Sequence, residues 1–264
     1  MGGRSQTEIC VAYTSSSAAV SVRPNIVARL KNVLRPLEPY LPRPAPRLSW
    51  RQSVAVMRRH GFLPVTVFDI GVGFGTFGLY HLFPDAFYHL VEPTREALPH
   101  VEKLTRRLRC DIHPVALGDH DGEAQLEVRS DIQGSTLLEE VGRRDFVRFD
   151  RVPMRRFDSL FTQIERPALC KIDVQGAELM VLNGMTGRIA DIDALIIETS
   201  TIATVKGGAE VHGVMNFMHD HGFALADVIG LKRRPLDDAT AQLDLLFVPE
   251  NSPLRADRRW ATDS

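Results

Sequence analysis

The sequence predicts an α/β fold in which a mostly parallel sheet of seven strands carries helices on both faces and has an antiparallel last strand. Short apolar runs alternate with helical patterns from residue 65 onward, as in βαβ units. A glycine-rich turn follows the first run, where such sheets bind ligands. The last two runs, 223–229 and 243–248, have no helical pattern between them, and this short connection implies an antiparallel pair.

Residues 1–50 differ from the rest of the chain. Small residues surround Ser15–Ser17, and repeated prolines over 36–46 exclude a long helix there, so one short helix over 25–34 is expected. We expect an appendage over 1–50, a main domain over 51–250 and a tail over 251–264. The appendage is interpreted as loosely docked, with a cover for the cleft and a homodimer contact as the alternatives.

The main domain begins with a helix over 49–60 and then the stretch VTVFDIGVGFGTFGL at 65–79. Its β-branched and apolar start predicts a buried strand, which passes directly into the glycines and then into a helix over 76–83. Glycine accepts positive φ and lets the backbone approach a ligand closely. We therefore expect a ligand at this turn, although a plain strand-to-helix connection is the alternative.

Two ligand classes fit the turn. GFGTFG, which begins at Gly73, matches the dinucleotide pattern, and Glu92 lies where an acid reaches ribose hydroxyls, so an NAD(P)-dependent oxidoreductase is one reading. Asp69 opposes it, because a carboxylate at the strand mouth repels a pyrophosphate. S-adenosylmethionine (SAM) carries a sulfonium and an ammonium group, which an acid attracts. The charges favour SAM.

The remaining elements follow in order. Strands are expected over 86–91, 111–117, 168–174 and 194–197, and helices over 95–108, 177–185 and 211–221. Residues 123–129 alternate between polar and apolar side chains and predict a half-exposed strand, placed in a hairpin at the sheet edge.

Acids follow four of the expected parallel strands: Asp69, Glu92, Asp173 and Glu198. The carboxyl ends of parallel strands line one crevice, and such strands are otherwise apolar. The sequence therefore predicts an acidic crevice that attracts a cation.

The composition of the chain limits the partners and the compartment that we expect. The net charge of -1 gives no reason to expect nucleic acid or an anionic membrane surface. Cys10, Cys110 and Cys170 are far apart, which indicates neither a disulfide framework nor a paired-cysteine site. Unpaired cysteines fit a reducing compartment, and the sequence has no apolar run long enough to span a membrane. We therefore expect a cytoplasmic protein without membrane insertion.

Arginines are concentrated over 143–156. A solvated face is the ordinary reading of such a run. The alternative is a donor surface for an anionic group on the substrate. The residues are Arg143, Arg144, Arg148, Arg151, Arg155 and Arg156.

The motifs resemble those of FkbM-type SAM-dependent methyltransferases. The resemblance spans residues 66–248 and is carried by FDIGVGFGTFGLY, LVEP, VALGDHDGEAQLEV, GSTL and, most specifically, KIDVQGAELMVLNG. It implies a Rossmann-like class I methyltransferase fold. It also implies methyl transfer from SAM to a hydroxyl oxygen of a sugar, glycan or natural product.

Position by position, the resemblance implies cofactor contacts along the crevice. The methionine end falls to Asp69, Gly71 and Gly75, the ribose to Glu92, the adenine to Ala116 and Leu117, and the reactive end to Asp173. Gly73, in the same turn, is also expected to contact the cofactor. Two positions depart from the family pattern, which often has Asn where this chain has Gly73 and Glu where it has Gln175.

A hydroxyl acceptor needs a base to take its proton. The candidates are Asp173, Glu198 and His212, which opens a helix. Clustered acids would permit Mg²⁺, but no ligand spacing requires a metal. A protein with this fold that binds partners without catalysis is the alternative outside the enzymes.

Overall fold

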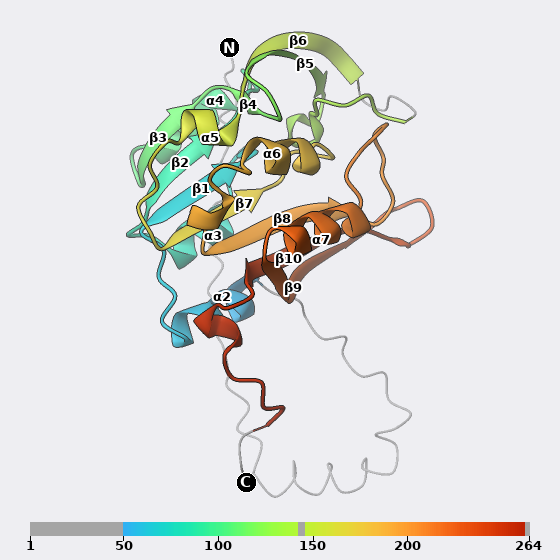
Figure 1. The fold of residues 1–264 in the computed structure, drawn as a ribbon. Coiled ribbons are helices and arrows are strands. Elements are labelled where there is room, and N and C mark those ends of the chain that lie inside the picture. The colour runs from blue at the N-terminus through green and yellow to red at the C-terminus, as the bar shows by residue number, and fades with distance from the viewer. Residues whose placement is uncertain (1–49, 142–145, 262–264) are drawn as a thin grey trace, which may run out of the picture. The chain divides into compact units, whose positions relative to one another are not determined.

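The computed structural model describes residues 50–141 and 146–261, and its centre is a seven-stranded sheet (Figure 1). The strand order is β3-β2-β1-β7-β8-β10-β9. β1, β2, β3, β7 and β8 pair in parallel, and β10 runs antiparallel to both β8 and β9. The predicted fold class is confirmed. The bounds are β1 Thr66–Ile70, β2 Phe87–Val91, β3 Arg109–His113, β7 Ala168–Ile172, β8 Ala194–Ser200, β9 Phe223–Arg233 and β10 Thr240–Pro249.

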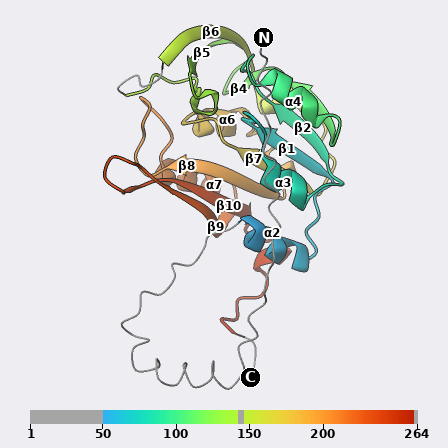
Figure 2. The same ribbon diagram turned by 180° about the vertical axis from the view of Figure 1, so that it is seen from behind.

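Helices cover both faces of this sheet (Figures 1 and 2). Alternate residues of a strand point to opposite faces, so Val67 joins one hydrophobic cluster and Phe68 the other. The first cluster contains residues of α2 (Trp50–Arg59), α3 (Phe77–Leu82) and α4 (Leu98–Leu104). The second contains residues of α5 (Phe157–Leu160), α6 (Glu178–Gly184) and α7 (Val211–Asp220). Because both faces are covered, β1 and β7 are buried along their whole length.

A second sheet of three strands has the order β4-β6-β5. Its strands are β4 (Ala116–Leu117), β5 (Gly122–Arg129) and β6 (Phe146–Arg155). The expectation of an edge hairpin over 123–129 was wrong, because Leu126 and Val128 of β5 pack on Val152 and Met154 of β6 in a separate small core. The strand expected over 111–117 is likewise divided. β3 ends at His113, the next residue is Pro114, which has no N–H for a ladder, and β4 joins the other sheet.

The described residues also form short 3-10 helices: η2 (Ile132–Gly134), η3 (Ile189–Asp191) and η4 (Pro253–Arg255). The helix expected over 25–34 lies outside the described residues. Within 50–141 and 146–261, no helix combines the length and the apolar character that crossing a bilayer demands.

Candidate functional site

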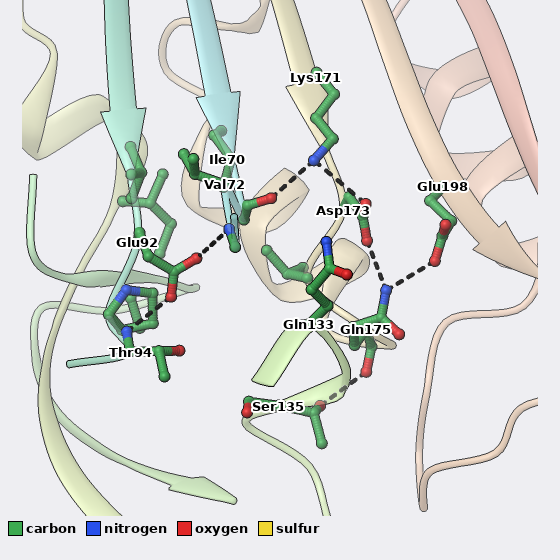
Figure 3. Close-up of a pocket in the computed structure, with 18 of the residues that line it drawn as sticks. Ile70, Val72, Glu92, Thr94, Gln133, Ser135, Lys171, Asp173, Gln175 and Glu198 are labelled. Atoms are coloured by element: carbon green, nitrogen blue, oxygen red, sulfur yellow. Dashed lines mark hydrogen bonds and ion pairs between the residues drawn. The ribbon is translucent and has the colours of Figure 1, made fainter. Parts of the chain in front are cut away.

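A cavity of about 280 Å³ opens at the carboxyl ends of the central strands (Figure 3). Its wall includes the turn after β1, Glu92 after β2, Asp173 after β7, and Glu198 near the carboxyl end of β8. The small sheet closes one side through Ala116 and Leu126. The fold therefore places the cavity where open α/β sheets bind ligands.

The glycine turn runs against the backbone that follows β7. Gly71 has a φ of +79°, and a Cβ built on it would lie 1.8 Å from the carbonyl oxygen of Asp173. No residue with a side chain fits at that distance. Gly71, Gly73 and Gly75, which the sequence analysis assigned to the cofactor, all line the cavity.

Glu92 is bonded to the same turn. One carboxylate oxygen accepts from the Gly73 backbone N–H at 2.7 Å, and the other accepts from the Thr94 backbone N–H at 2.7 Å (Figure 3). Glu92 is buried and lines the cavity. Each carboxylate oxygen has a second lone pair, so Glu92 still has acceptor capacity for a ligand hydroxyl.

Ala116 and Leu117 of β4 line the apolar part of the cavity. Both are buried, and Val115 and Leu126 lie in the same wall. This arrangement leaves a surface that suits a flat apolar ring.

Asp69 does not reach the cavity, so its expected direct contact with a ligand is corrected. It is fully buried on the α3 side of β1, the last strand residue but one. Its carboxylate accepts from the Tyr80 hydroxyl at 2.6 Å and the Thr76 hydroxyl at 3.1 Å, and it lies 3.4 Å from the Lys171 Nζ. Burial and the charge of Asp69 raise the pKa of Tyr80, which keeps this hydroxyl a donor.

Lys171 is a site residue that the sequence analysis missed. Its ammonium group donates to the Gly71 carbonyl at 2.8 Å and lies 3.3 Å from the Asp173 carboxylate. Burial lowers its pKa, but the charges of Asp173 and Asp69 outweigh burial and raise the pKa overall. The signal was present, because a lysine inside the apolar strand ALCKI needs buried carboxylate partners.

The carboxylates of Asp173 and Glu198 and the amide of Gln175 line the far end of the cavity (Figure 3). The Gln175 Nε2 donates to Asp173 at 2.6 Å and to Glu198 at 2.9 Å. The Gln242 Nε2 donates to the same Glu198 oxygen at 2.6 Å. Burial first, and then the charges of Asp173 and Asp244, raise the pKa of Glu198 to about 8. A carboxylate with this pKa binds and releases a proton near neutral pH.

Asp244 and Trp50 extend this end of the cavity, and the sequence analysis identified neither. The Trp50 indole N–H donates to the Asp244 carboxylate at 3.0 Å, and both residues line the cavity. Burial raises the pKa of Asp244. The pairing of the strands explains the position of Asp244, because this residue of β10 lies opposite Glu198 in the antiparallel register.

His212 lies away from the cavity. Its side chain is 79% exposed, and its Nδ1 is 3.6 Å from the Glu210 carboxylate. It belongs to the first turn of α7, where it faces solvent, so the structure does not bring it to the other candidate bases.

The arginines within and directly after β6 form ion pairs with carboxylates of the same chain. Arg148 pairs with Glu96 and Asp150, and Arg155 pairs with Asp121. Arg156 pairs with Asp158, and Arg151 lies 3.9 Å from Glu123. None of these four arginines lines the cavity, and Arg143 and Arg144 lie outside the described residues.

Metal ligands are not grouped in the parts of the chain that the structure describes. No set of three or more His, Cys, Asp or Glu side chains is placed there to hold an ion. At the far end of the cavity, the Gln175 amide bridges the carboxylates of Asp173 and Glu198.

Replacing Lys171 tests the buried ion pairs. Lys171→Met is expected to lower the free energy of unfolding by about 3–5 kcal/mol, because it leaves Asp69 as an unpaired buried charge. Urea denaturation measures this change. Lys103→Met, at an exposed position on α4, is the control and should stay within about 0.5 kcal/mol of the parent protein. Equal stability of the two variants would contradict the assignment.

The chain matches a family of known proteins. The family model described as "Methyltransferase FkbM domain" matches residues 69–225. No curated protein matches the chain.

Several solved structures are similar to this chain. Methyltransferase FkbM from Methylobacillus flagellatus KT has a TM-score of 0.45 and 18% identity over 73% of this chain and 47% of its own, so the present chain spans about half of that protein. Magnesium protoporphyrin IX methyltransferase from Synechocystis PCC 6803, with bound SAM, has a TM-score of 0.41 and 13% identity over 88% and 100%. A Burkholderia thailandensis 1,6-didemethyltoxoflavin-N1-methyltransferase with bound S-adenosylhomocysteine has a TM-score of 0.41 and 12% identity over 90% of this chain and 98% of its own.

Proposed function

The chain belongs to the FkbM methyltransferase family, and on that premise we propose that it transfers the methyl group of SAM to a hydroxyl oxygen of a sugar, glycan or natural-product acceptor. One observation carries the proposal: a single cavity has a ribose-type acid, Glu92, beside the glycine turn and a carboxylate of raised pKa, Glu198, at its other end. A cofactor subsite next to a proton acceptor in the same cavity is what methyl transfer requires, and this supports the proposal.

The cofactor subsite consists of the walls near β1, β2 and β4. Glu92 accepts the ribose hydroxyls through its remaining lone pairs, and Ala116 and Leu117 contact the adenine ring. The turn of Gly71 and Gly75 borders the methionine end. Asp69 acts on this subsite indirectly, because it holds Thr76 and Lys171, which themselves line the cavity.

The acceptor subsite consists of the walls near β7, β8 and β10. SAM, when bound, supplies a methyl group on a sulfonium centre, and S-adenosylhomocysteine (SAH) remains after transfer. Glu198 takes the hydroxyl proton of the acceptor as the new oxygen–carbon bond forms. Asp173 is a weaker candidate, because it is ion-paired with Lys171, whereas the partners of Glu198 are neutral amides.

The other functions considered for the sequence lose support. Membership in a methyltransferase family argues against an NAD(P)-dependent oxidoreductase. The Gly73 N–H, which would face a pyrophosphate in that reading, is bonded to Glu92. A protein without catalysis is separated from an enzyme by incubation with radiolabelled SAM and extracts of candidate glycans or metabolites, because it would transfer no label.

Calorimetry tests the cofactor subsite. The parent protein is expected to bind SAM and SAH and not NAD. Glu92→Ala should weaken SAH binding by about 10–100-fold, because it removes hydrogen bonds to a charged acceptor. Glu123→Ala, at an exposed position on β5, is the control and should bind SAH as the parent does. NAD binding without SAM binding would overturn the proposal.

A further inference from the structure

Gln175 has an unusual backbone that is held from several directions. Its φ is +55°, in the region that glycine favours. The Glu178 carboxylate accepts from the Val174 N–H at 3.2 Å and the Gly176 N–H at 2.9 Å, on either side of Gln175. The Thr136 hydroxyl donates to the Gln175 carbonyl at 2.8 Å. Such a conformation persists where the surroundings determine it, which points to a role for the side chain.

The Gln175 side chain lies between the two carboxylates of the acceptor subsite (Figure 3). Its Nε2 donates one hydrogen to Asp173 at 2.6 Å and the other to Glu198 at 2.9 Å, so both hydrogens are used. The opposite orientation of the amide would direct its oxygen at two carboxylate oxygens. The network therefore defines which atom is the nitrogen.

The two carboxylates differ in their other partners. Asp173 has the Lys171 ammonium 3.3 Å away. Glu198 has a second amide, that of Gln242, and makes no ion pair within residues 50–141 and 146–261. In addition to burial, the charge of Asp244 on β10 raises the pKa of Glu198, and the charge of Lys232 on β9 lowers it. Both amides bond the Oε1 of Glu198, and no bond among the described residues uses its Oε2.

We propose that Gln175 is a positioning residue, which holds the deprotonated form of Glu198 against Asp173 by means of a neutral amide and leaves the Oε2 of Glu198 for the acceptor hydroxyl. This inference rests on the proposed function, because it assigns Glu198 as the base. A carboxylate at position 175 would place three negative groups together, whereas the amide satisfies both neighbours without adding charge. Glutamine is therefore the side chain that fits between them.

The test uses proton exchange on cofactor binding and needs no acceptor. SAM carries a positive sulfonium and SAH does not, so SAM binding favours the deprotonated Glu198 and releases protons around its pKa, whereas SAH binding does not. Calorimetry in two buffers of different ionisation enthalpy measures these protons as a function of pH. Glu198→Gln is expected to abolish the difference between SAM and SAH.

Gln175→Leu removes both donors at similar side-chain volume. Loss of a donor destabilises the charged form of Glu198, so the pH of maximal proton release should rise by about one unit, while SAH affinity stays close to that of the parent. Gln175→Glu should raise the pH of maximal proton release further. Gln175→Asn keeps an amide and tolerates positive φ, but it is one methylene shorter, so it should shift the pH in the same direction even if the leucine variant fails to fold.

Gln125→Leu, at an exposed position on β5, is the matched control and should leave the proton release unchanged. An unchanged pH dependence in folded Gln175→Leu or Gln175→Asn, with normal SAH affinity, would overturn the inference. Failure of the parent protein to bind SAM or SAH would instead reject the proposed function.

Discussion

Glu198→Gln is expected to lower kcat for methyl transfer by about 10²–10⁴-fold, the usual contribution of a general base. The substitution keeps the shape of the side chain but removes its capacity to take a proton. Because the pKa of Glu198 is raised to about 8, the active, deprotonated form is present above that pH and is lost as the pH falls through it. Transfer of radiolabelled methyl from SAM between pH 6 and 9.5 measures the profile, which should rise towards a plateau in the parent protein.

Two comparisons make this result specific. SAH affinity of Glu198→Gln should stay close to the parent value, since Glu92 and the glycine turn form a different part of the wall. His212→Ala should retain full activity, because this side chain faces solvent. A Glu198→Gln enzyme that keeps the parent rate and its pH profile would remove Glu198 from the mechanism and leave Asp173 as the remaining candidate.

Local patterns in the sequence were sufficient to predict the fold and part of the cavity wall. The apolar run, the glycines and the helix that follow one another over 65–79 are determined by neighbouring residues, and the structure has them in that order. The antiparallel end followed from the length of one connection, between β9 and β10. Glu92 and Asp173 were found because parallel strands end at one edge of a sheet.

The errors share a physical cause, which is that the pairing of side chains between strands is not a local property. Asp69 follows apolar residues as Asp173 does, but the pleat of β1 turns it towards α3. There the Tyr80 hydroxyl donates a hydrogen bond to it, and Lys171 neutralises its charge. The interaction with Lys171 depends on the register of β1 with β7, in which the two residues are direct partners. That register is a tertiary feature that single-strand periodicity does not contain.

The same distinction explains the small sheet. Residues 123–129 alternate as a half-exposed strand should, and β5 does form there. The pattern does not say which strand it joins, because period two fits any sheet with one buried face. Its partner β6 begins after an intervening helix and loop, so the pairing of Leu126 with Asp150 was not visible from the alternation.

Gly71→Ala is expected to reduce both the stability of the fold and the binding of the ligand. The added Cβ would meet the Asp173 carbonyl oxygen at 1.8 Å, and the neighbouring atom is backbone, so the turn itself has to move. The Lys171 ammonium donates to the Gly71 carbonyl, and the Asp173 N–H donates to Ile70, so the displacement reaches both ends of the cavity. We expect a loss of about 2–5 kcal/mol in the free energy of unfolding, combining overpacking with the positive φ, together with loss of measurable SAH binding.

Gly61 allows the two contributions to be separated. Its φ of +81° is nearly that of Gly71, but no atom lies within 4 Å of a Cβ built on it. Gly61→Ala should therefore cost only the conformational part, about 1–2 kcal/mol, and should leave SAH binding intact. Urea denaturation of the two variants side by side gives the cost of the close approach as their difference. If both lost the same free energy and both bound SAH, then the contact between the glycine turn and the Asp173 backbone would not be what shapes the cavity.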